Sequence, residues 1–305
     1  MHRLSRARLR SSLCAARHRV RYCGQGLCAA RLDDGGDPHR IDAGERTRLP
    51  RANRHARRGA MSAPRVAVVT GGSAGIGRSV AEVLVREGWR VVGCARRLDA
   101  AEELLGAGIT LEQCDVADAL SVASLVETVR NRHGAVAALV NCAGIVLPRK
   151  NFVETSDADM EQLFAVNVFG TLRVTRALLP LMSDGGTIVN LSSTLASRPR
   201  PGSALYAATK GAIERFSTAL ATEVASRQIR VHVVAPALVR SRIWLEAGMS
   251  GEAYDALLAS RGKDFPLGRA GEPEDVSELI AFLVSSKANW MTGTAIQVDG
   301  GAMLR

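Results

Sequence analysis

Short apolar runs alternate with segments of helical period from residue 64 to the end of the chain. Turn residues bound the apolar runs, so we expect strands at residues 65–70, 90–95, 109–114, 136–141, 186–193, 229–235 and 294–298. Helical period and helix-start residues predict helices at residues 76–87, 118–132, 156–182, 204–226 and 272–285. This alternation predicts an α/β fold, a doubly wound parallel sheet of about seven strands with helices on both faces. The region has no internal repeat and no long linker, so we expect one domain.

The first sixty residues differ from the rest of the chain in pattern and in charge. They follow neither the strand period nor the helix period, and they contain 15 arginines, no lysine and 5 acidic residues. The excess of basic over acidic residues in this segment equals the formal net charge of +10 of the whole chain, so residues 61–305 are neutral. Because so little apolar surface cannot offset the entropy of ordering, we expect residues 1–60 to be a disordered, arginine-rich extension.

Three interpretations of this extension are open. Its first 32 residues contain neither Asp nor Glu, which is typical of an organelle transit peptide. An arginine-rich tail can also bind nucleic acid. We favour a third interpretation, in which the start is assigned too far upstream and the functional chain begins at Met61, in the sequence MSAPRVAVVTGG. The predicted domains are therefore residues 1–60, the extension, and residues 61–305.

Composition excludes several classes of function. The neutral domain offers no basic surface to nucleic acid, and no apolar run is long enough to span a membrane, so we expect neither partner. The six cysteines form no CxxC pair, and the spacing of the first three with the histidine among them matches no common zinc pattern, so we expect no metal site. We expect the other three cysteines to be buried in a reduced, cytoplasmic protein. These two groups are Cys14, Cys23 and Cys28 with His18, and Cys94, Cys114 and Cys142.

A glycine-rich turn joins the first predicted strand to the first predicted helix. In TGGSAGIG, residues 70–77, the glycines Gly71, Gly75 and Gly77 allow a tight backbone and a close approach to a phosphate. The helix that follows offers free N–H groups and the positive end of its dipole. An ordinary strand-to-helix turn is the alternative, but this position in the domain favours a dinucleotide site.

Two arginines follow the second strand, at the position where NAD-binding folds place an acidic residue. Ala95 occupies the acidic position, and Arg96 and Arg97 come next. An acidic side chain there binds the adenosine ribose of NAD, whereas a guanidinium favours the additional phosphate of NADP. We therefore expect NADP(H) to be preferred, with NAD(H) as the alternative.

A tyrosine and a lysine lie four residues apart in the predicted helix at 204–226. In YAATK, Tyr206 and Lys210 lie on one helical face. A phenol has an ordinary pKa of about 10, and a neighbouring ammonium lowers that pKa. Tyr206 is thus a candidate acid or base, although this spacing alone also occurs on surface helices.

Taken together, these segments resemble the short-chain dehydrogenase/reductase family in its compact single-domain form, which includes 3-oxoacyl-carrier-protein reductases. The similarity extends over residues 64–302. It implies a Rossmann-type sheet and a single dinucleotide-binding catalytic domain at residues 61–305. The resembling motifs are TGGSAGIG, CDVAD at 114–118, NCAG at 141–144, AVNVFG at 165–170, IVNLSS at 188–193, YAATK, PLGRAGEPEDV at 266–276 and TGTAIQVDGG at 292–301.

The resemblance implies a catalytic group of Asn167, Ser193, Tyr206 and Lys210. Tyr206 would protonate a carbonyl oxygen during reduction, or remove the proton from an alcohol during oxidation. Lys210 would lower the pKa of Tyr206 and bind the nicotinamide ribose. Ser193 would donate a hydrogen bond to the substrate oxygen, and Asn167 would hold a water that links Lys210 to solvent.

The resemblance also implies the residues that bind cofactor and substrate. The implied cofactor contacts are Gly71, Ser73, Gly75, Ile76, Gly77, Arg96, Arg97, Asp115, Val116, Asn141, Ala143, Gly144, Tyr206, Lys210, Pro236, Val239 and Ser241. The substrate contacts are Ser193, Leu195, Tyr206 and Trp244, the last in a mobile lid at residues 243–267. Other candidates for the pocket lining are Leu205, Leu245, Met249 and Tyr254. The chain departs from the family pattern at Cys142, where a second Asn is usual, and at Ala237, where a Gly is usual.

The predicted function is NADP(H)-dependent oxidation and reduction, which interconverts a ketone and a secondary alcohol. The alternatives are an NADP(H)-binding sensor without turnover and a nucleic-acid-binding protein that uses the basic extension. The family resemblance implies a homotetramer or a homodimer. No basic cluster in the domain by itself indicates docking of a carrier protein, although Arg149, Lys150, Arg198 and Arg200 are candidates for a charge-reversal test.

Overall fold

The computed structural model describes residues 65–98 and 108–304. These residues belong to one unit, Met61–Arg305. The extension predicted for residues 1–60 lies outside the described residues, as do the cysteines and the histidine within it.

Seven parallel strands form one sheet, as predicted. In chain order they are β1 (Val66–Thr70), β2 (Arg90–Ala95), β3 (Ile109–Gln113), β4 (Val136–Asn141), β5 (Met182–Leu191), β6 (Arg230–Pro236) and β7 (Ala295–Val298). The spatial order is β3-β2-β1-β4-β5-β6-β7. The chain therefore reverses its direction of winding between β1 and β4, which places a crevice at the carboxyl ends of these two strands.

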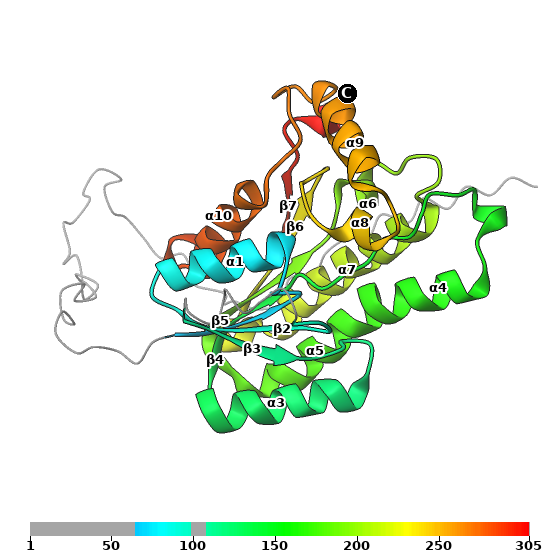
Figure 1. The fold of residues 1–305 in the computed structure, drawn as a ribbon. Helices are drawn as coiled ribbons and strands as arrows, with labels where there is room; N and C mark the ends of the chain where they lie inside the picture. Colours follow the sequence, from blue (N-terminus) through cyan, green and yellow to red (C-terminus); the bar gives the residue numbers. More distant parts are fainter. Residues whose placement is uncertain (1–64, 99–107, 305) are drawn as a thin grey trace, which may run out of the picture. The chain divides into compact units, whose positions relative to one another are not determined.

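Helices cover both faces of the sheet (Figure 1). On one face lie α1 (Gly75–Arg86) and α10 (Pro273–Val284), and on the other lie α3 (Ala119–His133), α5 (Thr171–Leu178) and α7 (Ala204–Glu223). Each face has its own buried core. Leu84 and Ile280 pack against the first face, and Val129 and Leu178 against the second. The strands are apolar on both sides because both sides are covered.

The helix predicted for residues 156–182 is divided into four helical segments, the last a short 3₁₀ turn at Leu179–Leu181, and it ends where β5 begins at Met182. A regular helix α4 (Asp157–Leu163) runs into a π-helical segment at Phe164–Gly170, which continues as α5. Gly170 leaves no room for a side chain, because a Cβ atom at that position would lie 2.6 Å from the Val116 side chain. The Thr171 hydroxyl donates to the Asn167 carbonyl at 3.1 Å within this wide turn. The widened segment therefore contains Asn167.

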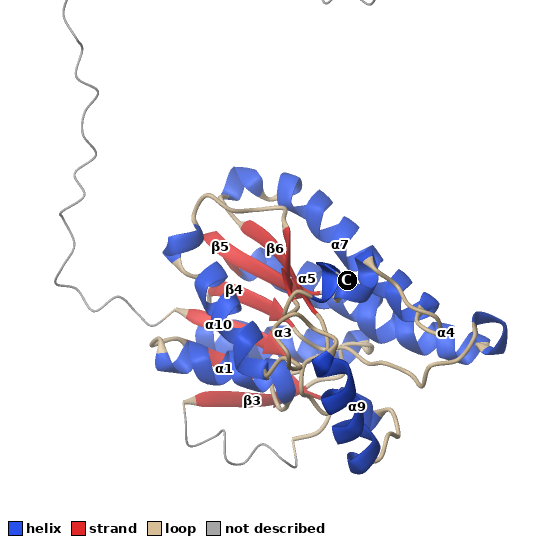
Figure 2. Cartoon of the chain, turned by 90° about the horizontal axis from the view of Figure 1, so that it is seen from above, coloured by secondary structure: helices blue, strands red, loops and turns tan. Residues whose placement is uncertain are grey.

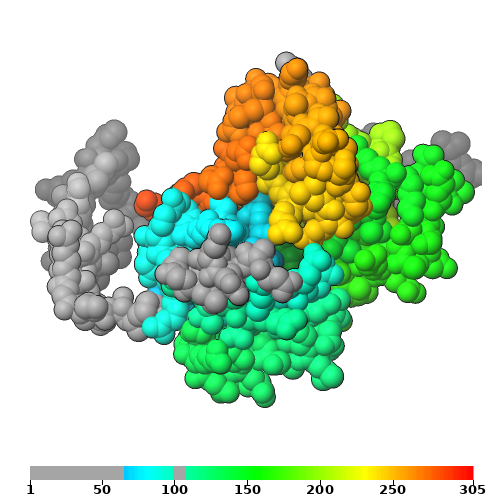
Figure 3. All heavy atoms as spheres, viewed as in Figure 1, coloured from blue at the N-terminus to red at the C-terminus, as the bar shows by residue number. Residues whose placement is uncertain are grey.

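Three further helices lie near the carboxyl ends of the strands: α6 (Thr194–Ser197), α8 (Ile243–Glu246) and α9 (Gly251–Lys263). Helices α8 and α9 form the lid, whose position over the carboxyl edge of the sheet is seen in Figure 2. In Figure 3 the lid, coloured yellow to orange, lies above the blue-to-cyan surface of α1. Within the described residues, no helix combines the length and apolar character needed to cross a membrane.

Candidate active site

Two adjoining pockets lie at the carboxyl edge of the sheet. The glycine-turn pocket contains Gly71 and Arg97, and the Tyr206 pocket contains Ser193 and Tyr206. Both pockets are lined by Ile76, Cys142, Gly144, Ser241 and Ile243. Because the two pockets share these residues, a single extended molecule can occupy both.

Most of the residues predicted to bind cofactor line one of the two pockets. Those in the glycine-turn pocket are Gly71, Ser73, Gly75, Ile76, Gly77, Arg96, Arg97, Asp115, Val116, Ala143, Gly144 and Ser241. Those in the Tyr206 pocket are Ile76, Gly144, Tyr206, Lys210, Pro236, Val239 and Ser241. Residues far apart in sequence thus meet at one edge because the carboxyl ends of parallel strands meet there.

The glycine turn has the geometry of a phosphate cradle. Gly71 and Gly75 have φ angles of +68° and +51°, which residues other than glycine rarely adopt. A Cβ atom on Gly77 would lie 2.2 Å from the Gly71 carbonyl oxygen, so the turn is closed to larger residues. Helix α1 begins after Ala74 with no side-chain cap and with no acidic residue in its first turn. Its first N–H groups and its dipole therefore fit an anionic pyrophosphate.

The far end of the glycine-turn pocket combines a fixed acidic turn with exposed arginines. Asp115 accepts a hydrogen bond from the Ala117 N–H at 2.9 Å, which orders the turn after β3. Arg97 is paired at 3.3 Å with Glu246 of lid helix α8, and both side chains are partly exposed. Glu246 also lines this pocket. Sequence reasoning missed it because it lies far along the chain, in the lid.

Asn141 differs from its prediction as a cofactor contact. Its side chain is buried within the sheet, where its Nδ2 donates to Thr175 Oγ1 at 3.0 Å and to Asn190 Oδ1 at 2.8 Å. Asn141 lines neither pocket. It lies at the last position of β4, where its side chain links the sheet to α5 and to β5 instead of facing a ligand.

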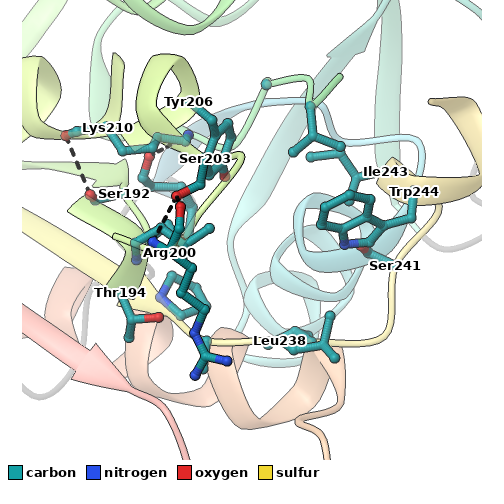
Figure 4. A pocket seen from close by; sticks show the side chains of 18 of the residues that line it. Ser192, Thr194, Arg200, Ser203, Tyr206, Lys210, Leu238, Ser241, Ile243 and Trp244 are labelled. Carbon is teal, nitrogen blue, oxygen red and sulfur yellow. Dashed lines mark hydrogen bonds between the residues drawn. The ribbon is translucent and has the colours of Figure 1, made fainter. Parts of the chain in front are cut away.

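Ser193, Tyr206 and Lys210 meet in the Tyr206 pocket. Ser193 ends the segment after β5 and caps α6, where its Oγ accepts from the Leu195 N–H at 3.2 Å. Ser193 and Tyr206 both line this pocket, and the Ser193 side chain acts to lower the pKa of Tyr206. Lys210 Nζ donates to the Leu191 carbonyl at 2.9 Å and lies 5.7 Å from the centre of the Tyr206 ring. Figure 4 shows Tyr206 and Lys210 on one side of the pocket, and Ile243 and Trp244 on the other.

Burial controls the protonation of this group. It raises the pKa of Tyr206 to about 12, although the Ser193 side chain acts in the opposite direction. Burial lowers the pKa of Lys210 to about 8. The predicted lowering of the pKa of Tyr206 by Lys210, together with the cationic oxidised nicotinamide, stays a prediction; in the protein alone the effect of burial is the largest. The Cys142 thiol beside them has a pKa raised to about 12 by burial, so it is neutral.

Asn167 lies behind Lys210 and holds the loop that follows β4. Its Oδ1 accepts from the Ile145 N–H at 2.8 Å, and its Nδ2 donates to the Ile145 carbonyl at 3.0 Å. A Cβ atom on Gly144 would lie 3.3 Å from Asn167 Oδ1 and 3.5 Å from Lys210 Nζ. The Asn167 amide is bound to the Ile145 backbone and so positions the floor of the pockets. Its predicted hold on a water stays a prediction.

The loop after β6 is ordered without the usual glycine. Among the described residues, Gln228 is the one non-glycine with a positive φ, so Ala237 adopts an ordinary conformation. The Ala237 N–H donates to the Val298 carbonyl at 3.1 Å. Farther along, the Ser241 N–H donates to the hydroxyl of buried Tyr254, on lid helix α9, at 2.7 Å. This hydrogen bond joins the loop to the lid.

The lid supplies part of the lining predicted for it. Trp244 and Leu195 line the Tyr206 pocket, whereas Leu205 lines a separate small pocket. Leu245, Met249 and Tyr254 do not line the Tyr206 pocket; Leu245 is exposed, and Tyr254, on α9, is buried. Sequence reasoning missed the apolar lining residues Val146, Leu147, Leu238, Ile243, Leu257 and Phe265 and the basic residue Arg261.

Comparison with known proteins places this geometry among enzymes. Residues 71–303 match the family model described as enoyl-(acyl carrier protein) reductase. The chain is 38% identical over 247 residues to the 3-oxoacyl-[acyl-carrier-protein] reductase of Bos taurus, covering 79% of this chain and 98% of the relative. It is 37% identical over 245 residues to an uncharacterised oxidoreductase of Methylorubrum extorquens, covering 78% and 97%.

Solved structures agree with the sequence matches. A short-chain dehydrogenase/reductase of Brucella melitensis, titled glucose/ribitol dehydrogenase, superposes with a TM-score of 0.72 at 30% identity. The alignment covers 78% of this chain and 96% of that protein. The fold and the sequence therefore point to the same set of relatives.

Proposed function

The chain belongs to the short-chain dehydrogenase/reductase family, whose members are NAD(P)-dependent oxidoreductases. We propose that it interconverts a ketone and a secondary alcohol with NADP(H). Tyr206 is the acid and base of this reaction. The observation that supports the proposal is the meeting of Ser193, Tyr206 and Lys210 in a pocket that adjoins the glycine turn.

Each side chain has a task in carbonyl reduction. Tyr206 donates its phenolic proton to the carbonyl oxygen, and Ser193 donates a hydrogen bond to the same oxygen as negative charge develops there. Lys210 stabilises the resulting phenolate by its charge when it is protonated. Asn167 is a positioning residue, because it fixes the Ile145 backbone through two hydrogen bonds. A bound nicotinamide would supply the hydride in reduction and accept it in oxidation.

The cofactor in this proposal is NADP(H), with NAD(H) used less well. Arg96 and Arg97 both line the glycine-turn pocket, where a guanidinium can bind a phosphate on the adenosine ribose. Glu246 opposes this preference because it also lines the pocket and is paired with Arg97. The strength of the preference for NADP(H) therefore depends on whether Arg97 exchanges the Glu246 carboxylate for the phosphate.

We also propose a homotetramer or homodimer in the cytoplasm. Exposed apolar side chains support self-association. Phe152 is 61% exposed, Val153 is 90% exposed, and Phe169, in the π-helical segment, is 54% exposed. Apolar groups gathered before α4 and after it suit an interface between copies of the chain. Light scattering with size-exclusion chromatography would measure the assembly.

A screen of carbonyl compounds and secondary alcohols with both cofactors tests the proposed activity. We expect oxidation of NADPH to depend on a ketone, and Tyr206→Phe to abolish turnover while retaining the fold and cofactor binding. The full chain and residues 61–305 are compared in the same assay. Tight binding of NADPH without turnover across the panel would contradict the proposed activity, as would near-normal activity of Tyr206→Phe.

A further inference from the structure

The Tyr206 pocket is lined by more positive charge than the proposed reaction uses. Besides Lys210, three arginines line it: Arg149, Arg200 and Arg261. Its lining residues all lie in the described part of the chain, and none of them is Asp or Glu. The reaction uses Lys210, so the three arginines have no role in the proton transfer.

The arginines come from three separate segments. Arg149 lies in the loop after β4, Arg200 in the turn between α6 and α7, and Arg261 near the end of α9. The first two segments are packed together, since a Cβ atom on Gly202 would lie 3.2 Å from Arg149 Cβ. The Arg200 backbone is held by Ser203, whose Oγ accepts from the Arg200 N–H at 2.9 Å and donates to its carbonyl at 2.6 Å. The fold itself therefore brings these charges to one pocket.

The guanidinium groups have little compensation from carboxylates. No hydrogen bond or ion pair joins the Arg200 guanidinium to another described residue, and its side chain points into the pocket (Figure 4). Arg149 lies over the Trp244 ring, 5.6 Å from its centre. Arg261 is 3.4 Å from Asp264, whose side chain is 60% exposed and does not line the pocket.

Other arginines near the lid are paired with acidic side chains. Arg240 contacts Asp255 at 3.2 Å and Glu272 at 3.3 Å. Arg269 forms two hydrogen bonds with Asp275, at 2.6 and 2.8 Å. These two arginines thus have acidic partners, whereas within the described residues no ion pair joins Arg149 or Arg200 of the Tyr206 pocket to an acidic side chain. Positive charges held together in a partly buried site repel one another, and an anion relieves that repulsion.

We infer that the carbonyl substrate of this pocket also carries an anionic group, a carboxylate or a phosphate, which Arg149, Arg200 and Arg261 bind. This inference rests on the proposed function and deepens it by naming a substrate class. Guanidinium groups bind both anions through paired, charge-assisted hydrogen bonds. The apolar residues Leu238 and Trp244 line the same pocket and suit the carbon chain that joins the anion to the carbonyl.

Matched pairs of substrates test the inference with the full chain and NADPH. The carboxylate pair is 4-oxopentanoate and its methyl ester, and the phosphate pair is dihydroxyacetone phosphate and dihydroxyacetone. We expect kcat/KM to be at least about tenfold higher for one of the two anions than for its neutral partner, mainly through a lower KM. The pair with the larger ratio identifies the anionic group.

Single substitutions assign the effect to the pocket. Arg149→Gln, Arg200→Gln and Arg261→Gln should each reduce the ratio of kcat/KM between the anion and its neutral partner, by about tenfold for the residue in direct contact. Arg130→Gln is the matched control, because Arg130 is an exposed arginine of α3 that lines neither pocket. Three separate variants keep the test decisive where one of them fails to fold.

A binding measurement separates this inference from the proposed function. Calorimetry with the NADP⁺ complex, in which cofactor phosphates occupy the glycine turn, should detect 4-oxopentanoate or dihydroxyacetone phosphate but not the neutral partner. Arg200→Gln should lose that binding. If neutral ketones are turned over and each anion has the same kcat/KM as its neutral partner, the inference is overturned and the proposed function stands. Absence of all turnover would overturn the proposed function. Calorimetry would then test the anion site separately, and failure to bind either anion would overturn the inference.

Discussion

Lys210 Nζ lies 5.7 Å from the centre of the Tyr206 ring, and it donates its 2.9 Å hydrogen bond to the Leu191 carbonyl and not to the phenol. Both groups are removed from water, which raises the pKa of Tyr206 to about 12 and lowers that of Lys210 to about 8. Burial therefore disfavours the charged form of each residue, and the pH dependence of the protein should reflect this.

The stability of the wild-type protein should increase with pH relative to Lys210→Met between pH 8 and pH 10. The folded pKa of Lys210, about 8, is below its ordinary value of 10.5. In this range the unfolded chain binds more protons at this residue, so raising the pH favours the folded state. The gain should be about 1 kcal/mol per pH unit. Urea unfolding of both proteins at matched pH measures it, and parallel curves would contradict the shift.

Oxidation of an alcohol and reduction of a ketone should respond differently to pH. Oxidation requires Tyr206 as phenolate, whose fraction increases about tenfold per pH unit below a pKa near 12. Reduction requires the phenol, which predominates at neutral pH. We expect kcat for reduction to be flat between pH 6 and pH 7.5, where Lys210 is also protonated, and oxidation to rise steadily. Initial rates in both directions test this, and a pH-independent oxidation would exclude phenolate as the base.

Glu246→Gln should strengthen binding of NADPH. The substitution removes the carboxylate that is paired with Arg97 at 3.3 Å and that lines the same pocket. We expect a decrease in KM for NADPH of roughly threefold to tenfold. The change for NADH should be smaller, because NADH lacks the additional phosphate on the adenosine ribose. Glu252→Gln is the control, since Glu252 is exposed on α9 and lines neither pocket. Equal effects on both cofactors would show that Arg97 does not contact the phosphate.

Gly77→Ala should weaken cofactor binding, whereas Gly211→Ala should stabilise the fold. A Cβ atom on Gly77 would lie 2.2 Å from the Gly71 carbonyl oxygen, whereas one on Gly211 would have no neighbour within 4 Å. Gly77→Ala should displace the turn and weaken cofactor binding at least about tenfold, since a misplaced cradle loses its hydrogen bonds. Gly211→Ala, inside α7, should stabilise the fold by about 0.5–1 kcal/mol. Cofactor titration and thermal unfolding of both variants test this contrast.

The fold was predictable because the apolar runs, the helical periods and the turn residues all indicate the same arrangement. The apolar runs at residues 65–70 and 136–141 lie within one residue of β1 and β4, and the glycine turn follows β1 as expected. The π-helical segment around Asn167 was not predicted, because the sequence pattern of residues 156–182 indicates one continuous helix. Helix α6 was missed since four residues show no periodicity.

The candidate site was predictable in its residue types and less so in its contacts. Tyr206 and Lys210 share a helical face by spacing, but only the tertiary structure shows that Lys210 reaches the Leu191 carbonyl. Asn141 could not be separated from pocket residues by its motif, because its orientation depends on Thr175 and Asn190. Likewise, Arg261 in the lid has no local pattern that distinguishes it from a surface arginine.

The hydroxyl of Tyr254 couples the lid to the two pockets. It accepts from the Ser241 N–H at 2.7 Å, and so joins a lid helix to a loop that lines both pockets. A lid tied in this way cannot swing open without disturbing the loop beside the glycine turn. A displacement of lid helix α9 would therefore be passed to a loop that both pockets share, through a single phenol outside the reacting group.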